Sequence, residues 1–593
     1  MGRRRMPPRG RRIASALALA VVASAAPAAS AQDTSALEQL PATHASTPRG
    51  SSSLAPLPSV VPTPKTVDGD ISDWTGSGTG FGGTVVHDRG ELVYTDHIFD
   101  SWGSDEGADA RRKEQFRETE RAVPQARRLE SLGQNAPDEL KSARIWSPEN
   151  YGDAGFQPAA DLLELRLASD GQSLHVLART TTMAAPTDTA VLLLADTVPG
   201  GSRDAGFNSG ITTGAEVAVL LAHGAARAHD LAGGTETAVE AKVNPSGFVN
   251  AIEAAVPLSL LGAGEGLKLS AATGLFDPAT SELKTLSVGP NPANVAFRTD
   301  EPVRTWFDQR QAIALHSRSI DDFSVDVDIA KLSSGHSERY SPGPGYHDRV
   351  FTSSEAISSE GSRDGIHQHY GLYLPEAVRM DSLLPLTFWM HWRGGNTHGA
   401  GNVVPRVFAD LGEANGSIVV APRGRGTSTW YLGEGHADFN EVWDDATRLW
   451  PVDRDRVYVS GHSMGGWASY LLSILYPDRF AAAFSVAAPV TQGAWTGLDF
   501  PGCDSYASGG SSPCYVQSND GDARTQHTRK LLDNVRNVPL AIFHGAADEL
   551  VPVSGVTRQV EKLVQLGYRH RYYVFPNYEH YTHPALDQWA EGA

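Results

Sequence analysis

The segment from Arg456 to Tyr470, which reads RVYVSGHSMGGWASY, constrains the fold of this chain more than any other. A β-branched and aromatic run leads into a G-x-S-x-G pentapeptide centred on Ser463, and small, helix-tolerant residues follow it. This order predicts a strand, a sharp turn with strained backbone at the serine, and a helix. Glycine at positions 461 and 465 would let strand and helix pass closely, so Ser463 is a candidate nucleophile exposed at a helix N-terminus.

From about residue 365 onward, apolar strand-like runs alternate with helical segments. Such alternation predicts a mostly parallel, doubly wound sheet. The predicted strands are 367–374, 386–392, 417–421, 457–460, 481–487, 540–544 and 571–575, and the predicted helices include 439–449, 465–475 and 554–566.

A serine nucleophile needs a base, and the base needs an acid that orients it. Asp548 follows a predicted strand, at the sheet edge where α/β active sites form, and is the candidate acid. The adjacent Glu549 is an alternative, and Asp548 could instead cap the next helix. His580 follows the last strand and is the candidate base, with His583 as the alternative. The order Ser…Asp…His is that of the α/β-hydrolases.

An oxyanion formed at Ser463 would need backbone N–H donors. We expect one from Met464 and a second from Trp392 or Arg393, in the loop MHWRGGN that follows the third strand of the pattern. The side chain of His391 is interpreted as a core histidine. His462, inside the pentapeptide, is a candidate substrate contact.

The segment 491–524 lies between two predicted strands, where hydrolases place substrate-binding insertions. It supplies Trp495 and Tyr515 as candidate substrate contacts, and a low-complexity surface loop is the alternative reading. It also holds both cysteines of the chain, Cys503 and Cys514. In an oxidising compartment a disulfide is expected, with two free buried thiols as the alternative.

Four motifs carry a family resemblance: YGLYLP at 370–375, PVDRDRVYVSGHSMGG at 451–466, YPDRF at 476–480 and HGAAD at 544–548. On these, residues 365–593 resemble secreted α/β-hydrolases of the polyhydroxybutyrate-depolymerase and feruloyl-esterase-like group and the prolyl oligopeptidase catalytic domain. The resemblance implies an α/β-hydrolase fold with Ser463 as nucleophile, Asp548 as acid and His580 as base. The chain departs from prolyl oligopeptidases in having no propeller ahead of this domain, and its closing helix after His580 is short.

Residues 65–300 contain short alternating runs that are typical of β-strands. Leucines at 163, 165 and 167 alternate with Glu164 and Arg166 before a turn at Asp170-Gly171. This predicts a hairpin with one buried face, and further short strands predict a β-sandwich. These further strands are expected at 189–195, 215–221, 238–243 and 247–256. The charged stretch 104–140 is expected to be a solvated helix or an insertion, and residues 301–364 a connecting segment.

Two motifs in this region, VDGDISDW at 67–74 and IEAAVPLSLLG at 252–262, resemble family 9 carbohydrate-binding modules and DOMON-like sandwiches. The resemblance implies an all-β sandwich whose relatives bind sugars, haem or nothing known. Trp74 is interpreted as a core residue rather than a platform for sugar stacking.

Residues 1–31 have a basic start, an apolar core and a small-residue cleavage site at Ala29-Ser30-Ala31. This predicts a secretory signal peptide and a secreted protein, with a membrane anchor as the alternative. Arg11-Arg12 leaves export by the twin-arginine route open. Residues 32–64, rich in Ser, Thr, Pro and Ala, are expected to be a disordered linker.

The formal net charge of −19 argues against nucleic acid or an anionic membrane as partner. With two cysteines, no metal site or cofactor is expected. The sequence therefore predicts a secreted serine hydrolase that cleaves a carboxylic ester of a small molecule or an extracellular polymer, without predicting its oligomeric state. The alternatives are a prolyl oligopeptidase-like peptidase, although no propeller or acidic pair for a peptide N-terminus is found, and a catalytically inert carbohydrate-binding protein.

Overall fold

In the computed structural model, the described residues are 52–76, 79–104, 157–245, 249–262, 266–286, 289–299, 309–357, 365–379, 381–393, 395, 397, 404, 406–426, 429–490, 528–548, 550–586, 589–590 and 592. The predicted signal peptide, the segment 491–524 and nearly all of the charged stretch 104–140 lie outside these ranges. Within them, no helix has both the length and the apolar character needed to cross a membrane.

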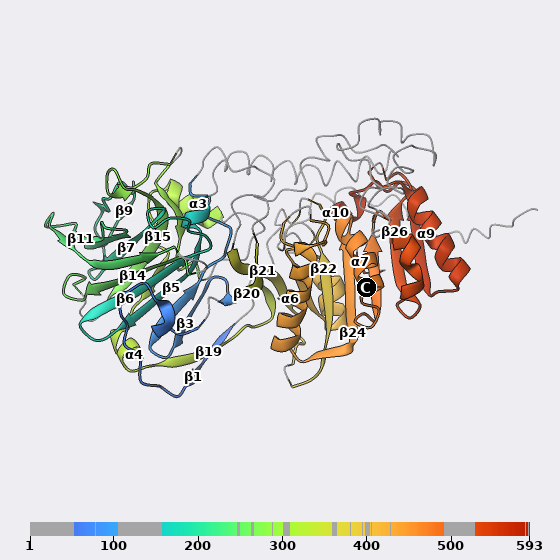
Figure 1. Cartoon of the computed structure of the whole chain (residues 1–593), viewed down its shortest axis with the longest axis horizontal. Coiled ribbons are helices and arrows are strands. Elements are labelled where there is room, and N and C mark those ends of the chain that lie inside the picture. Colours follow the sequence, from blue (N-terminus) through green and yellow to red (C-terminus); the bar gives the residue numbers. More distant parts are fainter. Residues whose placement is uncertain are drawn as a thin grey trace, which may run out of the picture. The chain divides into compact units, whose positions relative to one another are not determined.

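The N-terminal region contains two antiparallel sheets (Figure 1). The six-stranded sheet has the order β13-β14-β6-β5-β4-β3. Its strands are β3 (Thr84–Asp88), β4 (Glu91–Thr95), β5 (Leu162–Ser169), β6 (Ser173–Thr180), β13 (Glu240–Asn244) and β14 (Ala251–Pro257). The second sheet has the order β12-β11-β10-β7-β15-β16, and β17 and β18 also pair with β15. Its strands are β7 (Thr189–Asp196), β10 (Val217–Ala222), β11 (Arg227–Asp230), β12 (Glu236–Ala238), β15 (Lys268–Asp277), β16 (Glu282–Leu283), β17 (Pro292–Val295) and β18 (Ser324–Asp326).

The two sheets share one hydrophobic cluster, to which each contributes every second residue of its strands. Leu165 and Leu167 of β5 belong to it, as do Val191 and Leu193 of β7. The period of two is that of strands with one face toward a common core, so the alternation in the sequence located Leu165 and Leu167 correctly. Leu163 was placed wrongly: a register shift between Leu162 and Glu164 puts Leu162 in this cluster and Leu163 in a separate one. Short additional elements border this region: η2 (Ile71–Asp73), η4 (Pro158–Ala160), β8 (Arg203–Asp204), β9 (Thr212–Thr213), α3 (Gln309–His316) and α4 (Ile329–Ser333).

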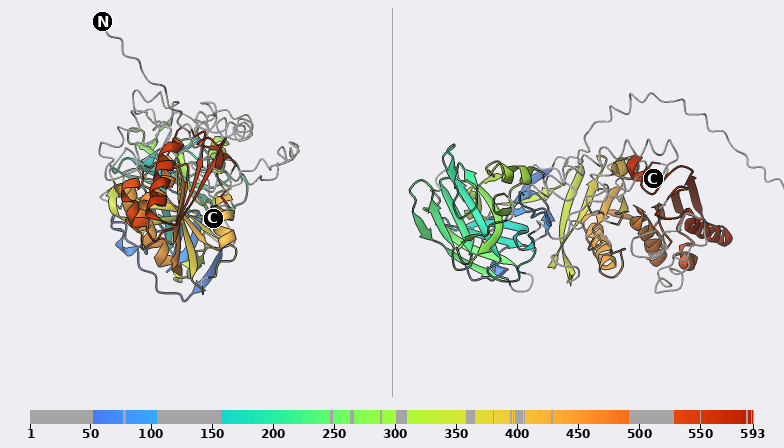
Figure 2. Two further views of the ribbon diagram at one scale, coloured as in Figure 1. Left: turned by 90° about the vertical axis from the view of Figure 1, so that its right-hand side faces the viewer. Right: turned by 90° about the horizontal axis from the view of Figure 1, so that it is seen from above.

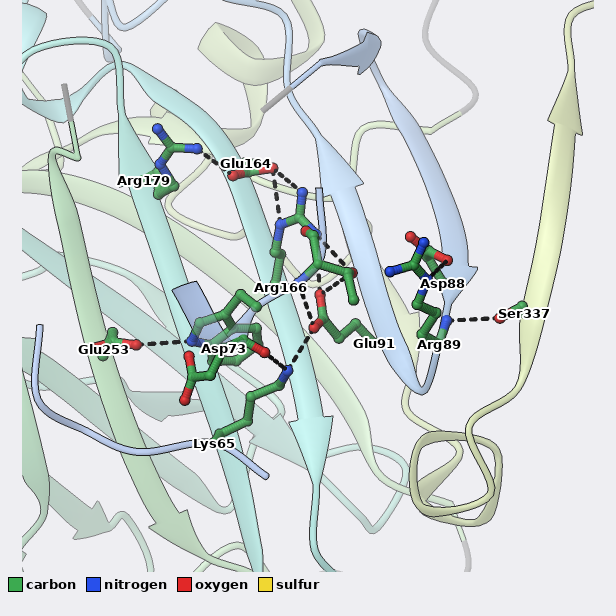
Figure 3. Close-up of polar contacts among 12 residues, drawn as sticks. Lys65, Asp73, Asp88, Arg89, Glu91, Glu164, Arg166, Arg179, Glu253 and Ser337 are labelled. Atoms are coloured by element: carbon green, nitrogen blue, oxygen red, sulfur yellow. Dashed lines mark hydrogen bonds and ion pairs between the residues drawn. The ribbon is translucent and has the colours of Figure 1, made fainter. Parts of the chain in front are cut away.

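The predicted hairpin is present, with β5 and β6 paired antiparallel, but the expectation of a single buried face was wrong. Glu164 and Arg166 point away from the core and are nevertheless buried, with side chains 3% and 5% exposed. Arg166 binds Glu164 at 2.8 Å and Glu91 of β4 at 3.0 Å, and Arg179 of β6 binds Glu164 at 2.9 Å (Figure 3). These opposite charges lie on neighbouring strands, where cross-strand pairs meet, and together they make this outer face a second buried surface.

The segment that carries the VDGDISDW motif covers part of this face. Trp74 is buried, and its indole N–H donates to Glu253 at 2.8 Å, while the backbone N–H of Gly69 donates to the other oxygen of Glu253 at 2.7 Å. Lys65 lies 4.9 Å from the centre of the Trp74 ring and binds Glu91 at 2.7 Å. The motifs VDGDISDW and IEAAVPLSLLG are therefore joined by the hydrogen bonds of Trp74 and Gly69 to Glu253. Trp74 is a buried, packed residue, as expected.

The C-terminal region is built on a nine-stranded sheet with the order β2-β20-β21-β23-β22-β24-β25-β26-β27. Its strands are β2 (Gly80–Phe81), β20 (Gly345–Ile357), β21 (Gly365–Leu374), β22 (Leu384–Met390), β23 (Ile418–Pro422), β24 (Val452–His462), β25 (Ala482–Val486), β26 (Leu540–Gly545) and β27 (His570–Phe575). The pairs from β23 through β27 are parallel, and those at β20 and β21 are antiparallel. Each strand predicted from residue 367 onward overlaps an observed strand.

Helices α6 (Glu434–Leu449), α7 (Met464–Leu475) and α9 (Val553–Leu566) pack on one face of this sheet. Their apolar residues join Phe388 of β22 in one core cluster, while its neighbour Trp389 belongs to a cluster on the opposite face. Figure 2 shows the red helix α9 beside the strands. This layered arrangement of parallel strands and helices is an α/β-hydrolase fold. The shorter elements are η5 (Phe408–Gly412), η6 (Glu413–Asn415), η9 (Thr528–Val535) and α10 (Thr582–Leu586).

Four strands lie within segments that the sequence predicts to be a linker or a connection. Strand β1 (Ser53–Leu57), within the predicted linker, pairs with β19 (Ser337–Ser341). Strand β20, within the predicted connecting segment, is part of the nine-stranded sheet and also pairs with β2 from the N-terminal region. Strand β18, from the same connecting segment, pairs with β15. The segment 301–364 thus supplies a strand to each region.

Candidate active site

Ser463 lies in the sharp turn that the sequence predicts between β24 and α7. Its φ of 56° and ψ of −118° are unusual for a residue with a side chain, so the backbone is strained there. A Cβ atom built on Gly461 would lie 2.5 Å from the backbone of Gly465, and one on Gly465 would lie 1.9 Å from the carbonyl oxygen of Met390. Both glycines are therefore required by close backbone packing, and that packing holds Ser463 in its conformation.

The structure brings Ser463, His580 and Asp548 into one hydrogen-bonded chain. The hydroxyl oxygen of Ser463 lies 2.8 Å from Nε2 of His580, and Nδ1 of the same ring lies 2.9 Å from Oδ2 of Asp548. Asp548 follows β26 and His580 follows β27, two neighbouring parallel strands whose carboxyl ends meet at one edge of the sheet. His580 is 3% exposed, so this chain of hydrogen bonds is largely shielded from water.

Asp548 is fixed by the turn that follows β26. Its Oδ1 atom accepts hydrogen bonds from the backbone N–H groups of Leu550 at 3.0 Å and Val551 at 2.7 Å. Helix α9 begins only at Val553, with Pro552 at the capping position, so Asp548 is not its cap. The alternative acid, Glu549, lies outside the described residues.

His583, the alternative base, lies in a different environment. Its ring packs against Phe543, Phe575 and Tyr578, and neither ring nitrogen has a hydrogen-bond partner among the described residues. Burial lowers the pKa of His583 to about 3, so the ring is neutral at neutral pH. Of the two candidate histidines, it is His580 that the structure brings to Ser463.

Two further histidines contact this chain of hydrogen bonds. His462 is buried, and its Nε2–H donates to the backbone carbonyl of His580 at 2.8 Å. Its pKa lies well below the ordinary value because of burial and the nearby ring of His580. His544 donates from Nε2 to the carbonyl of Val551 at 2.7 Å and lies 3.4 Å from Oδ2 of Asp548. Sequence reasoning missed His544, although its position at the end of the strand before Asp548 could have indicated it.

A small pocket of about 80 Å³ opens at Ser463. Its lining comprises Arg393, Trp430, Ser463, Pro489, Leu550, Val551, His580 and Tyr581. Arg393 thus lines the pocket beside the serine, whereas Trp392 is buried with its ring against that of His462. Met464 is the first residue of α7 and is fully buried. His462 is not part of this lining, so its position differs from that expected of a substrate contact.

Sequence reasoning also missed Trp430 and Tyr581, which line the pocket. Trp430 has a positive φ of 57° and packs edge-on against Trp467 of α7. No short motif surrounds it, so only the fold brings it to the site. His391 is buried, with its ring nitrogens 2.8 Å from two backbone carbonyl oxygens, as expected of a core histidine. The candidate substrate residues Trp495 and Tyr515, and the cysteines Cys503 and Cys514, lie outside the described residues.

Comparison with known proteins gives matches to the C-terminal region. A model of the prolyl oligopeptidase family matches residues 410–589, a range that contains Ser463, Asp548 and His580. A probable feruloyl esterase C of Aspergillus flavus is 28% identical over 149 residues, which are 23% of this chain and 53% of the relative. A bifunctional acetylxylan esterase/xylanase of Neocallimastix patriciarum is 27% identical over 151 residues, 24% of this chain and 21% of the relative.

Among solved structures, a substrate-bound fluorophosphonate-binding serine hydrolase F of Staphylococcus aureus is similar to 42% of this chain. The likeness covers 96% of that protein at 18% identity, with a TM-score of 0.32. The chain spans about half the length of the feruloyl esterase that it matches and a smaller part of the bifunctional enzyme. The family model and the esterase relatives support a serine hydrolase.

Proposed function

We propose that this protein is a secreted serine hydrolase that cleaves carboxylic esters through an acyl-enzyme, with Ser463, His580 and Asp548 as its catalytic residues. The observation that supports it most is the 2.8 Å separation between the Ser463 hydroxyl and Nε2 of His580, with Asp548 on the far side of the ring. A nucleophile within hydrogen-bond reach of a base, itself oriented by an acid, is the arrangement that acyl transfer requires.

In the proposed mechanism, His580 takes the proton of Ser463 as the serine oxygen attacks the ester carbonyl. Asp548 holds the imidazole with its proton on Nδ1 and stabilises the imidazolium that forms. His580 then gives the proton to the leaving alcohol, and water, activated by the same ring, releases the acid from Ser463. Two sets of hydrogen bonds support this arrangement: the carbonyl of His580 accepts from His462, and the carboxylate of Asp548 accepts from two backbone N–H groups.

The oxyanion of the tetrahedral intermediate would lie at the N-terminus of α7. We assign its donors to the backbone N–H of Met464 and of Arg393 or Trp392. Arg393 lines the same pocket as Ser463, which favours it as the second donor. Each such donor would lower the barrier by about 3 kcal/mol.

An ester of an extracellular polymer, such as an acylated polysaccharide, is the substrate class that we favour. Relatives named as feruloyl esterase and acetylxylan esterase support it, together with the resemblance of the N-terminal region to carbohydrate-binding modules. Secretion through the segment 1–31, and the lining of a substrate wall by Trp495, Tyr515 and a Cys503–Cys514 disulfide, belong to the same proposal. A peptidase is the second candidate, because the matching family model is that of prolyl oligopeptidases.

The test is to label the full-length protein with a fluorophosphonate probe and to assay p-nitrophenyl acyl esters and aminoacyl anilides in parallel. We expect labelling and ester turnover, both lost in Ser463→Ala and kept in Ser382→Ala, a control at an exposed serine. Anilide turnover well above ester turnover would favour the peptidase. An unlabelled, inactive protein that still binds insoluble polysaccharide would favour an inert binding protein.

A further inference from the structure

A second group of chemically active side chains lies in the N-terminal region. Among the residues that the structure describes, His87, His336 and Glu338 each bring one ligand atom to within 4.8 Å of the others. His87 is on β3, whereas His336 precedes β19 and Glu338 is its second residue. His87 therefore meets two residues that lie 249 and 251 positions further along the chain.

Both imidazoles lie within hydrogen-bonding distance of the Glu338 carboxylate. Nδ1 of His87 lies 3.2 Å from Oε2 of Glu338, and Nε2 of His336 lies 2.9 Å from Oε1. The two rings meet edge to face, with centroids 5.4 Å apart. Ligand atoms bound to zinc at 2.0–2.2 Å with tetrahedral angles stand about 3.4 Å apart. The two nitrogen–oxygen separations are close to that spacing, and the three ligand atoms lie within 4.8 Å of one another, so side-chain movements could bring all three to a tetrahedral ion.

We propose that His87, His336 and Glu338 form a binding site for a divalent transition-metal ion, with Zn²⁺ as its natural occupant and water as the fourth ligand. Two imidazoles and one carboxylate are ligands that suit Zn²⁺, and three protein ligands with one open position are a common zinc arrangement. Hard cations such as Ca²⁺ and Mg²⁺ prefer sites made entirely of oxygen ligands.

The charge and accessibility of the group suit an ion that enters from solvent. The Glu338 carboxylate lies between the two imidazoles and would offset part of the positive charge of an ion. The side chains of His87, His336 and Glu338 are 12%, 23% and 13% exposed, so the group is shielded but reachable. The ammonium of Lys331 lies 4.0 Å from Glu338, and this side chain is 45% exposed, so it can turn to solvent when an ion binds.

The backbone around the group is held in place without an ion. The N–H of Gly90 donates to the carbonyl of His336 at 2.9 Å, and the N–H of Arg89 donates to the hydroxyl of Ser337 at 2.7 Å (Figure 3). These bonds join the β3–β4 turn to the start of β19 and so pre-position all three ligands. A bound ion would add a further link between these two segments.

The experiment uses the full-length protein without a histidine tag, stripped with a chelator and titrated with Zn²⁺ by calorimetry. The wild-type protein is compared with His336→Gln and Glu338→Gln. His175→Gln is the matched control, because His175 also lies beside a carboxylate, at 3.4 Å from Asp170, but without a second histidine. Circular dichroism establishes that each variant is folded, and visible absorption with Co²⁺ as probe reports the coordination geometry.

We expect the wild-type protein and His175→Gln to bind one Zn²⁺ more than His336→Gln and Glu338→Gln, or to bind it at least about 100-fold more tightly. The same two proteins should show the intense absorption of four-coordinate Co²⁺. Equal stoichiometry and affinity in all four proteins, or equal loss in the His175→Gln control, would overturn the proposal. If either His336→Gln or Glu338→Gln is unfolded, the other variant and the Co²⁺ spectrum of the wild-type protein show whether the site binds a metal ion.

Discussion

The outer face of the six-stranded sheet and the edge of the sheet around Ser463 both bury polar side chains, but they satisfy them differently. On the outer face, both oxygens of Glu164 and of Glu91 have partners, and each of these two carboxylates meets at least one cation. Around Ser463, the Nδ1 atoms of His462 and His544 have no partner among the described residues. The serine itself has a strained φ. Fully paired groups are typical of a structural network, whereas unpaired buried groups and strain are typical of functional sites.

The largest effect should come from Asp548→Asn. The amide would present an N–H to His580 and so favour the wrong tautomer of the ring, which lowers kcat by about 10⁴-fold. KM and the midpoint of urea unfolding should change little, because the turn at Asp548 keeps a carbonyl oxygen for its two backbone donors. Steady-state kinetics with p-nitrophenyl esters would measure the change in kcat and in KM. A loss of less than tenfold would contradict the role assigned to Asp548.

The outer face should respond in stability and not in catalysis. Arg166→Met leaves Glu164 and Glu91 buried with one cation fewer each, and removal of one member of a buried ion pair costs about 3–5 kcal/mol. We expect a lower urea midpoint with unchanged kcat in the folded enzyme. Arg456→Met is the control, because its ion pair with Asp453 is exposed, and its midpoint should stay near that of the wild-type protein. A large loss of kcat in Arg166→Met would contradict the assignment of the outer face to stability alone.

The pH dependence of stability should also separate the regions. Burial opposes ionisation of Glu164, but Arg166 and Arg179 outweigh it and lower its pKa from 4.5 to about 2. This group therefore stabilises the folded state fully above about pH 4.5, by about 3 kcal/mol, and the contribution is lost as the pH falls toward 2. The difference in unfolding midpoint between wild-type protein and Glu164→Gln should shrink from pH 7 to pH 3. A constant difference would contradict a lowered pKa.

The smallest of these effects concerns His462, which we regard as a positioning residue. His462→Ala removes the hydrogen bond to the carbonyl of His580 and should lower kcat by about 10- to 100-fold through misplacement of the base. KM should change little, because His462 does not line the pocket. His462→Gln retains an N–H donor and should recover much of the loss. Equal activity of the two variants would show that the hydrogen bond does not position His580.

The sequence predicted the catalytic region well because its signals are local. Apolar runs located the strands of the sheet, the glycines around Ser463 indicated the turn, and the position of His580 after the last strand indicated a base. Strand β20 escaped prediction, since its sequence GYHDRVFTSSEAI is too polar to resemble a core strand. Its Asp348 is fully buried between His97 and His369, and such pairing exists only in the folded chain.

Burial of the outer face could not be predicted for a related reason. Alternation correctly indicates that Glu164 and Arg166 point away from the core, but it cannot indicate that Thr75, from a distant segment, contacts Arg166 on that face. The choice between His580 and His583, three residues apart, likewise depended on the turn after β27. Pocket residues such as Trp430 carry no motif at all, so their role follows from geometry alone.

The exchange of strands between the two regions limits how far this protein can be treated as a set of separable modules. A catalytic fragment cut at residue 365 would lack β20 and β2, and an N-terminal fragment ending at residue 300 would lack β18. Grafting either half onto another protein would expose an unpaired sheet edge, and exposed edges promote aggregation. Natural recombination should therefore have moved the two halves as one inherited block.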